Sequence, residues 1–384
     1  MQKVKSITKY FLHSIGYLLN KFGDVSYKSL VRYEFPEFLN TTGGYHDVSI
    51  DSTSGFLCLV GFNTIGRGKI ILVDKNKGLR TVLDDCPVNY QIGSRCVMLN
   101  HREFPSVISS TFQADCAGKP ESTMFSLDGE VITKFPYDFI DVCESRFEAA
   151  AICFQTIKEN RPGYGFSRVP TDRELRIIDL RSSMPVLILS IECDFAFLKP
   201  SVSAFLNHIK FSPNGRFVFG FISENVPARK NKCWIFDRDT ENFVRGIEWS
   251  RFSIISHHCW VDDNTLLFFG FAEAGSNGYF LLNIETRGIS NFCSSIRVDG
   301  HPTCSQGTVF TDSYASHLGL QSICSIDHEG TRMLRRVFTR CSPGNPTRCD
   351  THPKIGSTHK TLYFDQFTDF NCSSRALCEI SLNG

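Results

Sequence analysis

Residues 207–221 read Asn-His-Ile-Lys-Phe-Ser-Pro-Asn-Gly-Arg-Phe-Val-Phe-Gly-Phe, and residues 233–240 close the same unit with Cys-Trp-Ile-Phe-Asp-Arg-Asp-Thr. The pattern predicts a short strand that carries a histidine, a Ser-Pro-Asn-Gly turn, an apolar strand, a polar loop and a third apolar strand. A fourth strand is expected at residues 243–247. Because one four-stranded sheet cannot bury both of its faces alone, copies of this unit are expected to stack around an axis.

Seven copies of the unit can be counted, which predicts an all-β, seven-bladed β-propeller of four-stranded antiparallel blades. Because the second and third copies are degenerate, six or eight blades stay open as alternatives. The copies cover approximately residues 43–74, 95–135, 144–189, 207–247, 257–284, 299–327 and 348–382. The last copy ends one strand short. The segment 29–35 alternates suitably and precedes the first copy, so we expect it to supply the outer strand of the last blade and close the ring.

The first 24 residues differ from the repeats. Apolar side chains recur there at helical spacing, and lysines stand at positions 3, 5, 9 and 21. This pattern predicts a short basic amphipathic helix, which packs either on the body of the chain or on an anionic membrane surface or a partner. The predicted organisation is a helix over 1–24, a closing strand within 25–42 and a propeller over 43–384.

The composition restricts the class of partner and the compartment. The chain has 41 basic and 40 acidic residues, which gives no support for a nucleic acid partner. Its 16 cysteines fall mostly in apolar strand-like runs and form no Cys-x-x-Cys pair, so we expect buried free thiols in a reducing compartment. The sequence contains no run of 18 apolar residues, so it predicts no membrane-spanning helix. We therefore expect a cytoplasmic chain, with peripheral membrane contact through residues 1–24 as one alternative.

Five copies place a histidine near the start of their first strand. First strands of propeller blades line the central channel, so these side chains are expected to converge at one mouth of it. A ring of imidazoles is a candidate metal site, and the alternative is that each histidine only forms hydrogen bonds within its own or the next blade. Neighbours on a strand point to opposite faces, and alignment with the other copies favours His258 over His257. The five histidines are His46, His208, His258, His301 and His352.

The sixth and seventh copies have the densest polar sequence. Asp299-Gly-His-Pro in the sixth copy is nearly repeated by Asp350-Thr-His-Pro in the seventh. A carboxylated sugar needs a cation or an arginine to neutralise its carboxylate, and a histidine or tyrosine to move a proton. The candidate residues that lie near these two motifs in sequence are Tyr314, Arg340, Arg348 and Lys354.

The His-x-x-Phe-Ser-Pro-Asn-Gly motif at 208–215, with the His-Pro pairs at 301 and 352, resembles propellers of the TolB and oligogalacturonate lyase type over most of 43–384. The lyase resemblance implies a divalent metal, typically manganese, held by several histidines and a glutamine, and a histidine that removes a uronate proton before β-elimination. By this resemblance His301 and His352 correspond to metal ligands, with His258 as a third. Where the lyases have a His-x-His pair, this chain has Asp350-x-His352, and no glutamine stands just before it. Aspartate is a residue type that can ligate a hard cation.

These features predict a carbohydrate-active propeller that binds or cleaves an acidic, uronate-type oligo- or polysaccharide with the help of a divalent metal. The expected catalytic residues are His208, His258, Arg348 and Tyr314. The expected metal ligands are His258, His301, His352 and Asp350, and the expected substrate-binding residues are His46, Arg340 and Lys354. Two alternatives stay open: a non-catalytic platform for protein partners, and a component of polysaccharide assembly by glycosyl transfer at the cytoplasmic face of a membrane.

Overall fold

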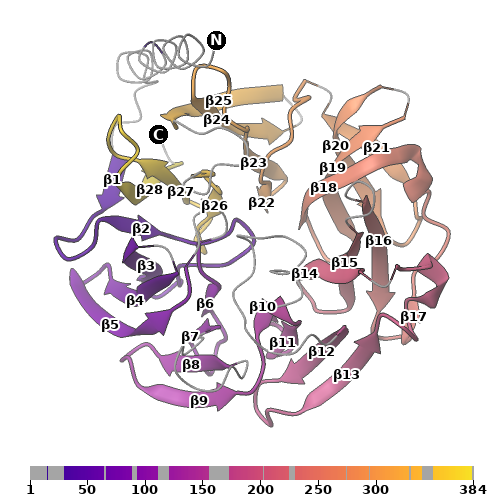
Figure 1. Ribbon diagram of the computed structural model, residues 1–384, viewed down its shortest axis with the longest axis horizontal. Helices are drawn as coiled ribbons and strands as arrows, with labels where there is room; N and C mark the ends of the chain where they lie inside the picture. The colour runs from indigo at the N-terminus through magenta and orange to yellow at the C-terminus, as the bar shows by residue number, and fades with distance from the viewer. Residues whose placement is uncertain are drawn as a thin grey trace.

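The computed structural model describes residue 15 and residues 30–64, 66–88, 93–110, 121–154, 173–201, 203–224, 230–273, 275–293, 295–327, 330–339 and 349–382. These residues form 28 β-strands and two short 3-10 turns, η1 (Ala196–Leu198) and η2 (Trp249–Arg251). The strands group into small sheets arranged as a ring, with first strands such as β10 and β22 near the centre and last strands such as β9 and β13 at the rim (Figure 1). The prediction of an all-β propeller is confirmed.

Five sheets are four-stranded and antiparallel, and their strands follow chain order. The first two comprise β6 (Cys96–Leu99), β7 (Ser106–Ser109), β8 (Ser122–Ser126) and β9 (Val131–Phe135), then β10 (Phe139–Cys143), β11 (Glu148–Ala151), β12 (Glu174–Asp179) and β13 (Pro185–Ser190). The next two comprise β14 (Phe205–Phe211), β15 (Phe217–Glu224), β16 (Lys230–Asp237) and β17 (Asn242–Phe243), then β18 (Phe252–Trp260), β19 (Thr265–Ala272), β20 (Asn277–Asn283) and β21 (Ile289–Cys293). The fifth comprises β22 (Thr303–Ser305), β23 (Thr308–Asp312), β24 (Leu320–Asp327) and β25 (Gly330–Phe338).

The remaining strands form one eight-stranded sheet. Its members are β1 (Leu30–Tyr33), β2 (Asn40–Thr42), β3 (Phe56–Thr64), β4 (Arg67–Asp74), β5 (Leu79–Cys86), β26 (Lys354–Ile355), β27 (Thr361–Phe367) and β28 (Arg375–Ser381). The first and last copies merge because β2 pairs with β3 and also, in parallel, with β28, where Asn40 lies opposite Arg375. The prediction of seven separate blades is therefore wrong: five sheets stand apart as blades, and two copies of the repeat share one sheet.

Strand β1 joins the beginning of the described propeller to its end. It pairs antiparallel with β28, from Leu30 opposite Ile380 to Tyr33 opposite Leu377, which is the pairing that ring closure requires. The division of the chain at residues 24 and 42 stays a prediction. Apart from residue 15, the helix predicted over 1–24 lies outside the described residues. Within the described ranges, no helix has the length and apolar character needed to cross a bilayer.

The Ser-Pro-Asn-Gly stretch forms the predicted turn between β14 and β15. Gly215 N donates to Ser212 O at 2.8 Å, and Phe217 N donates to Ser212 Oγ at 2.9 Å. Gly215 has a φ of +70°, and a Cβ at this position would stand 2.5 Å from Cys143 Sγ of the neighbouring blade. Both the backbone conformation and the close contact between blades therefore require glycine here.

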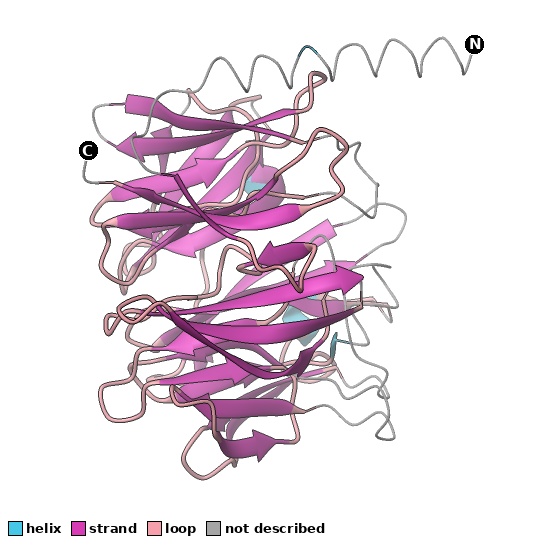
Figure 2. Ribbon diagram, turned by 90° about the vertical axis from the view of Figure 1, so that its left-hand side faces the viewer, coloured by secondary structure: helices cyan, strands magenta, loops and turns pink. Residues whose placement is uncertain are grey.

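The apolar core lies between neighbouring sheets, which stack side by side in the view of Figure 2. Phe217 and Phe219 of β15, for example, pack in one buried cluster with Trp260 and Phe268 of the next blade. Burial of both sheet faces is the driving force for stacking the units. The cysteines of the described ranges are free thiols and nearly all are buried or half-buried, as predicted from their places in apolar strands.

Candidate functional site

Five histidines and one tyrosine meet at the centre of the ring. The Tyr45 ring centroid lies 4.5 Å from that of His46 and 4.7 Å from that of His352, and the other three histidine rings lie within 6.4 Å of it. None of the five histidines is more than 8% exposed. We call the six residues the histidine cluster: Tyr45, His46, His208, His257, His301 and His352.

Tyr45 and His46 reach the centre on a loop, where the sequence predicted a strand. Gly44 has a φ of +79°, and a Cβ on it would stand 2.5 Å from the carbonyl oxygen of Ser94. Lys354 Nζ donates to Gly44 O at 2.7 Å and so fixes the loop from the opposite side. Glycine therefore lets the backbone pass close enough to its neighbours to carry the two aromatic side chains to the axis.

A β-bulge decides which histidine of β18 joins the cluster. The register of β18 against β19 shifts between Ile255 and His258, and such a shift changes the face that a residue occupies. The His257 ring centroid lies 4.3 Å from that of His301, whereas the His258 ring packs 4.4 Å from that of Phe219. The alignment of repeats favoured His258 over His257; the structure corrects this preference, and the bulge is the physical reason.

Two histidines of the cluster have a left-handed backbone. His208 has a φ of +52° and His352 a φ of +44°. The register of β14 against β15 also shifts around His208, between Asn207 and Lys210. Backbone strain of this kind costs on the order of 1–3 kcal/mol and is concentrated at functional sites. The strain therefore supports a functional role for the cluster beyond packing.

Aspartates hold two of the rings. His301 Nδ1 donates to Asp312 at 2.9 Å, and Thr351 Oγ1 donates to the same carboxylate at 2.6 Å. His257 Nδ1 donates to Asp299 at 3.1 Å. In each ring this hydrogen bond fixes the tautomer and leaves Nε2 as the atom that can bind a ligand or accept a proton.

Burial and charge give these rings unequal proton affinities. Burial disfavours the imidazolium of His301, but the Asp312 carboxylate outweighs this effect and raises the His301 pKa. Burial, with His301 nearby, lowers the pKa of His46 and of His352 well below the usual value. Burial also lowers the pKa of His257, although Asp299 opposes it. Rings whose pKa values are shifted in opposite directions suit a site that offers nitrogen atoms as ligands or bases.

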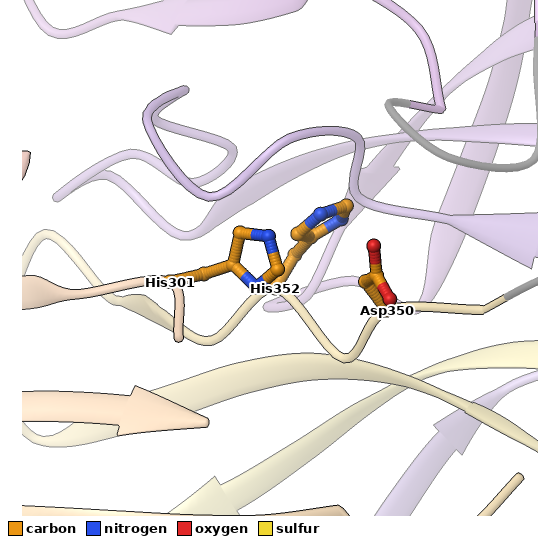
Figure 3. Close-up of side chains that lie close together, drawn as sticks. All are labelled: His301, Asp350 and His352. Carbon is orange, nitrogen blue, oxygen red and sulfur yellow. The ribbon is translucent and has the colours of Figure 1, made fainter. Parts of the chain in front are cut away.

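His301, Asp350 and His352 form a candidate cation site (Figure 3). One potential ligand atom from each residue lies within 4.8 Å of the others. No described residue hydrogen-bonds to either ring nitrogen of His352, although that side chain is wholly buried. A buried polar atom without a partner is unfavourable unless a ligand binds it, and imidazole with carboxylate suits manganese, iron or zinc. The residues present therefore fit a divalent metal.

The other residues predicted for the site take different positions. Tyr314 is half-buried, with its ring centroid 5.6 Å from that of His301. Lys354 is only 2% exposed, and its Nζ donates to two backbone carbonyls at 2.7 and 3.1 Å, so it braces the centre. Arg340 and Arg348 lie outside the described residues.

Sequence reasoning did not single out Tyr45 or His257. The Gly43-Gly44 pair directly before Tyr45 was an available signal, because paired glycines mark a place where the backbone approaches its neighbours closely. His257 offered no such signal, since the bulge in β18 depends on how that strand pairs with β19.

A cavity of about 540 Å³ adjoins the cluster. This volume lies within the range of roughly 300–1,000 Å³ that is typical of small-ligand sites. Segments from several blades line the cavity, among them residues with titratable side chains: His46, Lys210, His258, Lys354 and His359. His46 belongs to both the cluster and the cavity wall, so a ligand in the cavity lies next to the cluster.

No protein family matches the sequence, and no curated protein matches it. Solved structures do match the fold. An oligogalacturonate lyase in complex with manganese aligns with a TM-score of 0.62 at 13% identity, over 92% of this chain and 96% of the lyase. An oligogalacturonate lyase from Vibrio parahaemolyticus aligns with a TM-score of 0.61 at 10% identity, over the same shares of the two chains.

Propellers of other kinds are also similar. A chain of a mitotic checkpoint complex aligns with a TM-score of 0.52 at 8% identity, over 93% of this chain and 92% of that chain. The TolB structure from Acinetobacter baumannii, at 11% identity, covers 85% of this chain and 79% of that one with a TM-score of 0.42, which is too low to support an inference. At such identities the likeness shows the propeller fold alone.

Proposed function

We propose that this chain binds an acidic, uronate-type saccharide at the histidine cluster and cleaves it by metal-assisted β-elimination. The observation that carries the proposal is the meeting of His301, Asp350 and His352 at the centre of the propeller, with both ring nitrogens of His352 buried and lacking a partner among the described residues. The likeness to two oligogalacturonate lyases, one of them a manganese complex, supports the substrate class and the metal.

In this proposal His301, Asp350 and His352 hold the divalent metal. A metal bound there would supply Lewis-acid neutralisation of the sugar carboxylate, which would make the neighbouring C5–H more acidic. Asp312 keeps the His301 ring in one orientation through its hydrogen bond to Nδ1. The buried setting excludes water from the carboxylate, which strengthens each electrostatic contact to it.

His257 is the proposed acceptor of the C5 proton. Its lowered pKa keeps the ring neutral near pH 7, and its hydrogen bond to Asp299 leaves Nε2 able to take a proton and stabilises the imidazolium that results. The electron pair of the C5–H bond forms the C4=C5 double bond, and the C4–O bond breaks. Tyr314, 5.6 Å from His301 between ring centroids, is the proposed proton donor to the leaving oxygen.

Metal analysis of the purified chain tests the cation site. We expect a stoichiometric divalent metal, most of which is lost in the double variant His301→Ala/His352→Ala. His317→Ala is the matched control, because His317 is exposed and lies outside the cluster. Equal metal content in the double variant and the control would contradict the site, and thermal unfolding of all three proteins shows whether each is folded.

Elimination is tested separately with uronic-acid polymers, because the product has a conjugated double bond that absorbs in the ultraviolet. We expect this absorbance to grow with the manganese-loaded chain and to fall by about 10²–10⁴-fold in His257→Ala, the usual contribution of a general base. A folded, metal-containing chain that produces no absorbance across a panel of uronates would refute elimination and retain only the metal site.

A non-catalytic platform for protein partners is the second candidate. The propeller from a mitotic checkpoint complex, which aligns over 93% of this chain, favours it. A metal-free chain without activity on uronates would decide for this alternative. Glycosyl transfer in polysaccharide assembly, a cytoplasmic location and membrane contact through residues 1–24 stay hypotheses.

A further inference from the structure

We propose that Cys259 and Cys304 form a reversible disulfide that ties two neighbouring blades together beside the histidine cluster. This inference does not depend on the proposed function. Cys259 lies on β18 and Cys304 on β22, and their sulfur atoms are 2.6 Å apart. A disulfide bond is about 2.05 Å long, so the two free thiols lie within roughly half an ångström of bonding distance.

The two strands belong to different sheets. Cys259 pairs with Leu267 of its own blade, and Cys304 pairs with Val309 of the next. The described sheets share no backbone ladder between β18 and β22, so these blades contact each other through side chains. A disulfide would add a covalent cross-link to the packing and the His257–Asp299 hydrogen bond that already connect the two units.

Small reagents have a route to this pair. Both cysteines are half-buried, and both line the cavity of about 540 Å³. Cys58 and Cys96, by contrast, are 1% and 4% exposed and belong to a closed apolar core between blades. Accessibility limits the oxidation of cysteine, so an oxidant reaches the pair in the cavity wall before it reaches Cys58 and Cys96.

A peroxide is the class of oxidant that we propose. One thiolate attacks a peroxide oxygen, the O–O bond breaks, and the products are a sulfenic acid and water. The second thiol then attacks the sulfenic sulfur, forms the S–S bond and releases a second water. The two sulfurs lose two electrons in total, the peroxide gains them, and both thiol protons leave in water. A small dithiol reverses the reaction by thiol–disulfide exchange.

The disulfide would affect the histidine cluster because each of its two cysteines closely follows a histidine of the cluster in the sequence. Cys259 comes two residues after His257, and Cys304 comes three residues after His301. The rings of these two histidines lie 4.3 Å apart between centroids, on the same two blades. The disulfide would therefore hold constant the spacing between β18, which carries His257, and β22, which begins two residues after His301.

Mass spectrometry of a non-reduced digest tests the bond directly. After treatment of the full chain with hydrogen peroxide, we expect one cross-linked peptide pair that contains Cys259 and Cys304 and lacks two hydrogen atoms, and we expect dithiothreitol to remove it. The melting midpoint should rise by a few degrees on oxidation, because the bond closes a long loop between residues 45 apart. Absence of the peptide pair, or an unchanged midpoint when the pair has formed, would overturn the proposal.

Three variants show which cysteines are responsible for the cross-linked peptide pair and the shift in melting midpoint. Cys259→Ser and Cys304→Ser should each lose both the peptide pair and the shift in midpoint. Cys293→Ser is the matched control and should keep both, because its sulfur contacts the Ser295 hydroxyl at 2.9 Å and not another thiol. A shift that persists in both of the first two variants would show that another pair of thiols is responsible. The digest of the unaltered chain remains decisive if a variant fails to fold.

Discussion

The rings of His257 and His301 lie 4.3 Å apart between centroids, and each donates its Nδ1–H to a buried aspartate. The two residues come from neighbouring blades, so neither repeat contains this arrangement alone. Their environments shift the two rings in opposite directions, with a raised pKa at His301 and a lowered pKa at His257. Titratable groups whose environments push their pKa values apart are a recognised mark of acid–base sites.

Replacing Asp312 tests how the cation site is oriented. Asp312→Asn removes the charge that holds His301 Nδ1, so we expect the affinity for Mn²⁺ to fall by about 10–100-fold, the usual effect of losing such a partner. Isothermal titration calorimetry measures the affinity. Asp262→Asn, at a turn where Asp262 accepts from the Asn264 backbone, is the control and should bind Mn²⁺ like the unaltered chain. Equal affinity in both variants would contradict the orienting role.

The stability of the metal-free chain should fall as the pH drops below 6.5. Burial lowers the pKa of His46, His257, His258 and His352, so below pH 6.5 the unfolded chain binds protons that the folded chain excludes. Each such group lowers the free energy of unfolding by up to about 1.4 kcal/mol for each pH unit of acidification. His301 has a raised pKa and acts in the opposite sense: its stabilisation is present below its unfolded pKa and is lost as the pH rises through its folded value.

The four histidines with a lowered pKa outweigh the one with a raised pKa, so the free energy of unfolding should increase as the pH rises. Urea unfolding in the presence of a chelator, on both sides of pH 6.5, measures the free energy of unfolding. The double variant His46→Gln/His352→Gln should show a shallower dependence on pH. Stability that is constant, or that increases on acidification, would show that these rings are not buried in neutral form.

The ion pair of Arg375 with Asp365 should be essential for stability. Both side chains are wholly buried at the junction of β27, β28 and β2. Arg375→Met leaves the Asp365 carboxylate buried without its cation, and we expect a loss of about 3–5 kcal/mol in the free energy of unfolding. Arg67→Met is the control, since Arg67 pairs with Asp85 at an exposed site and should contribute less than about 1 kcal/mol. Similar losses in urea unfolding for the two variants would contradict this view.

A side chain at Gly44 should displace the loop that carries Tyr45 and His46. Gly44→Ala places a Cβ 2.5 Å from Ser94 O in a left-handed backbone, so we expect a loss of about 1–3 kcal/mol and a weaker cation site. Gly78→Ala is a matched control, because Gly78 has a φ of +66° but no atom within 4 Å of the place that a Cβ would occupy. Urea unfolding and Mn²⁺ titration should separate the two, and equal effects would show that the steric contact is unimportant.

Much of the fold was predictable because its signals are local. The Ser212-Pro-Asn-Gly turn, the apolar strand after it and their recurrence along the chain follow from turn chemistry and alternation within a few residues. The merger of the first and last copies was not predictable, because it depends on Asn40 meeting Arg375, residues from opposite ends of the propeller. Local pattern therefore predicted most strands of the repeats and the pairing of β1 with β28, but not the parallel pairing of β2 with β28 that merges two copies into one sheet.

The site divides in the same way. By itself the sequence determined that histidines recur near the start of the repeats, and that Asp350 accompanies His352, because repeat position and residue type are properties of the chain. Only the tertiary structure decided that His257 and not His258 joins the cluster, that Tyr45 occupies its centre, and that Lys354 is buried. A single-residue shift in the pairing of β18 with β19 changes the sheet face on which a side chain lies. The loop that follows Gly44 carries Tyr45 to the centre of the ring. Both depend on contacts between strands that are distant in sequence.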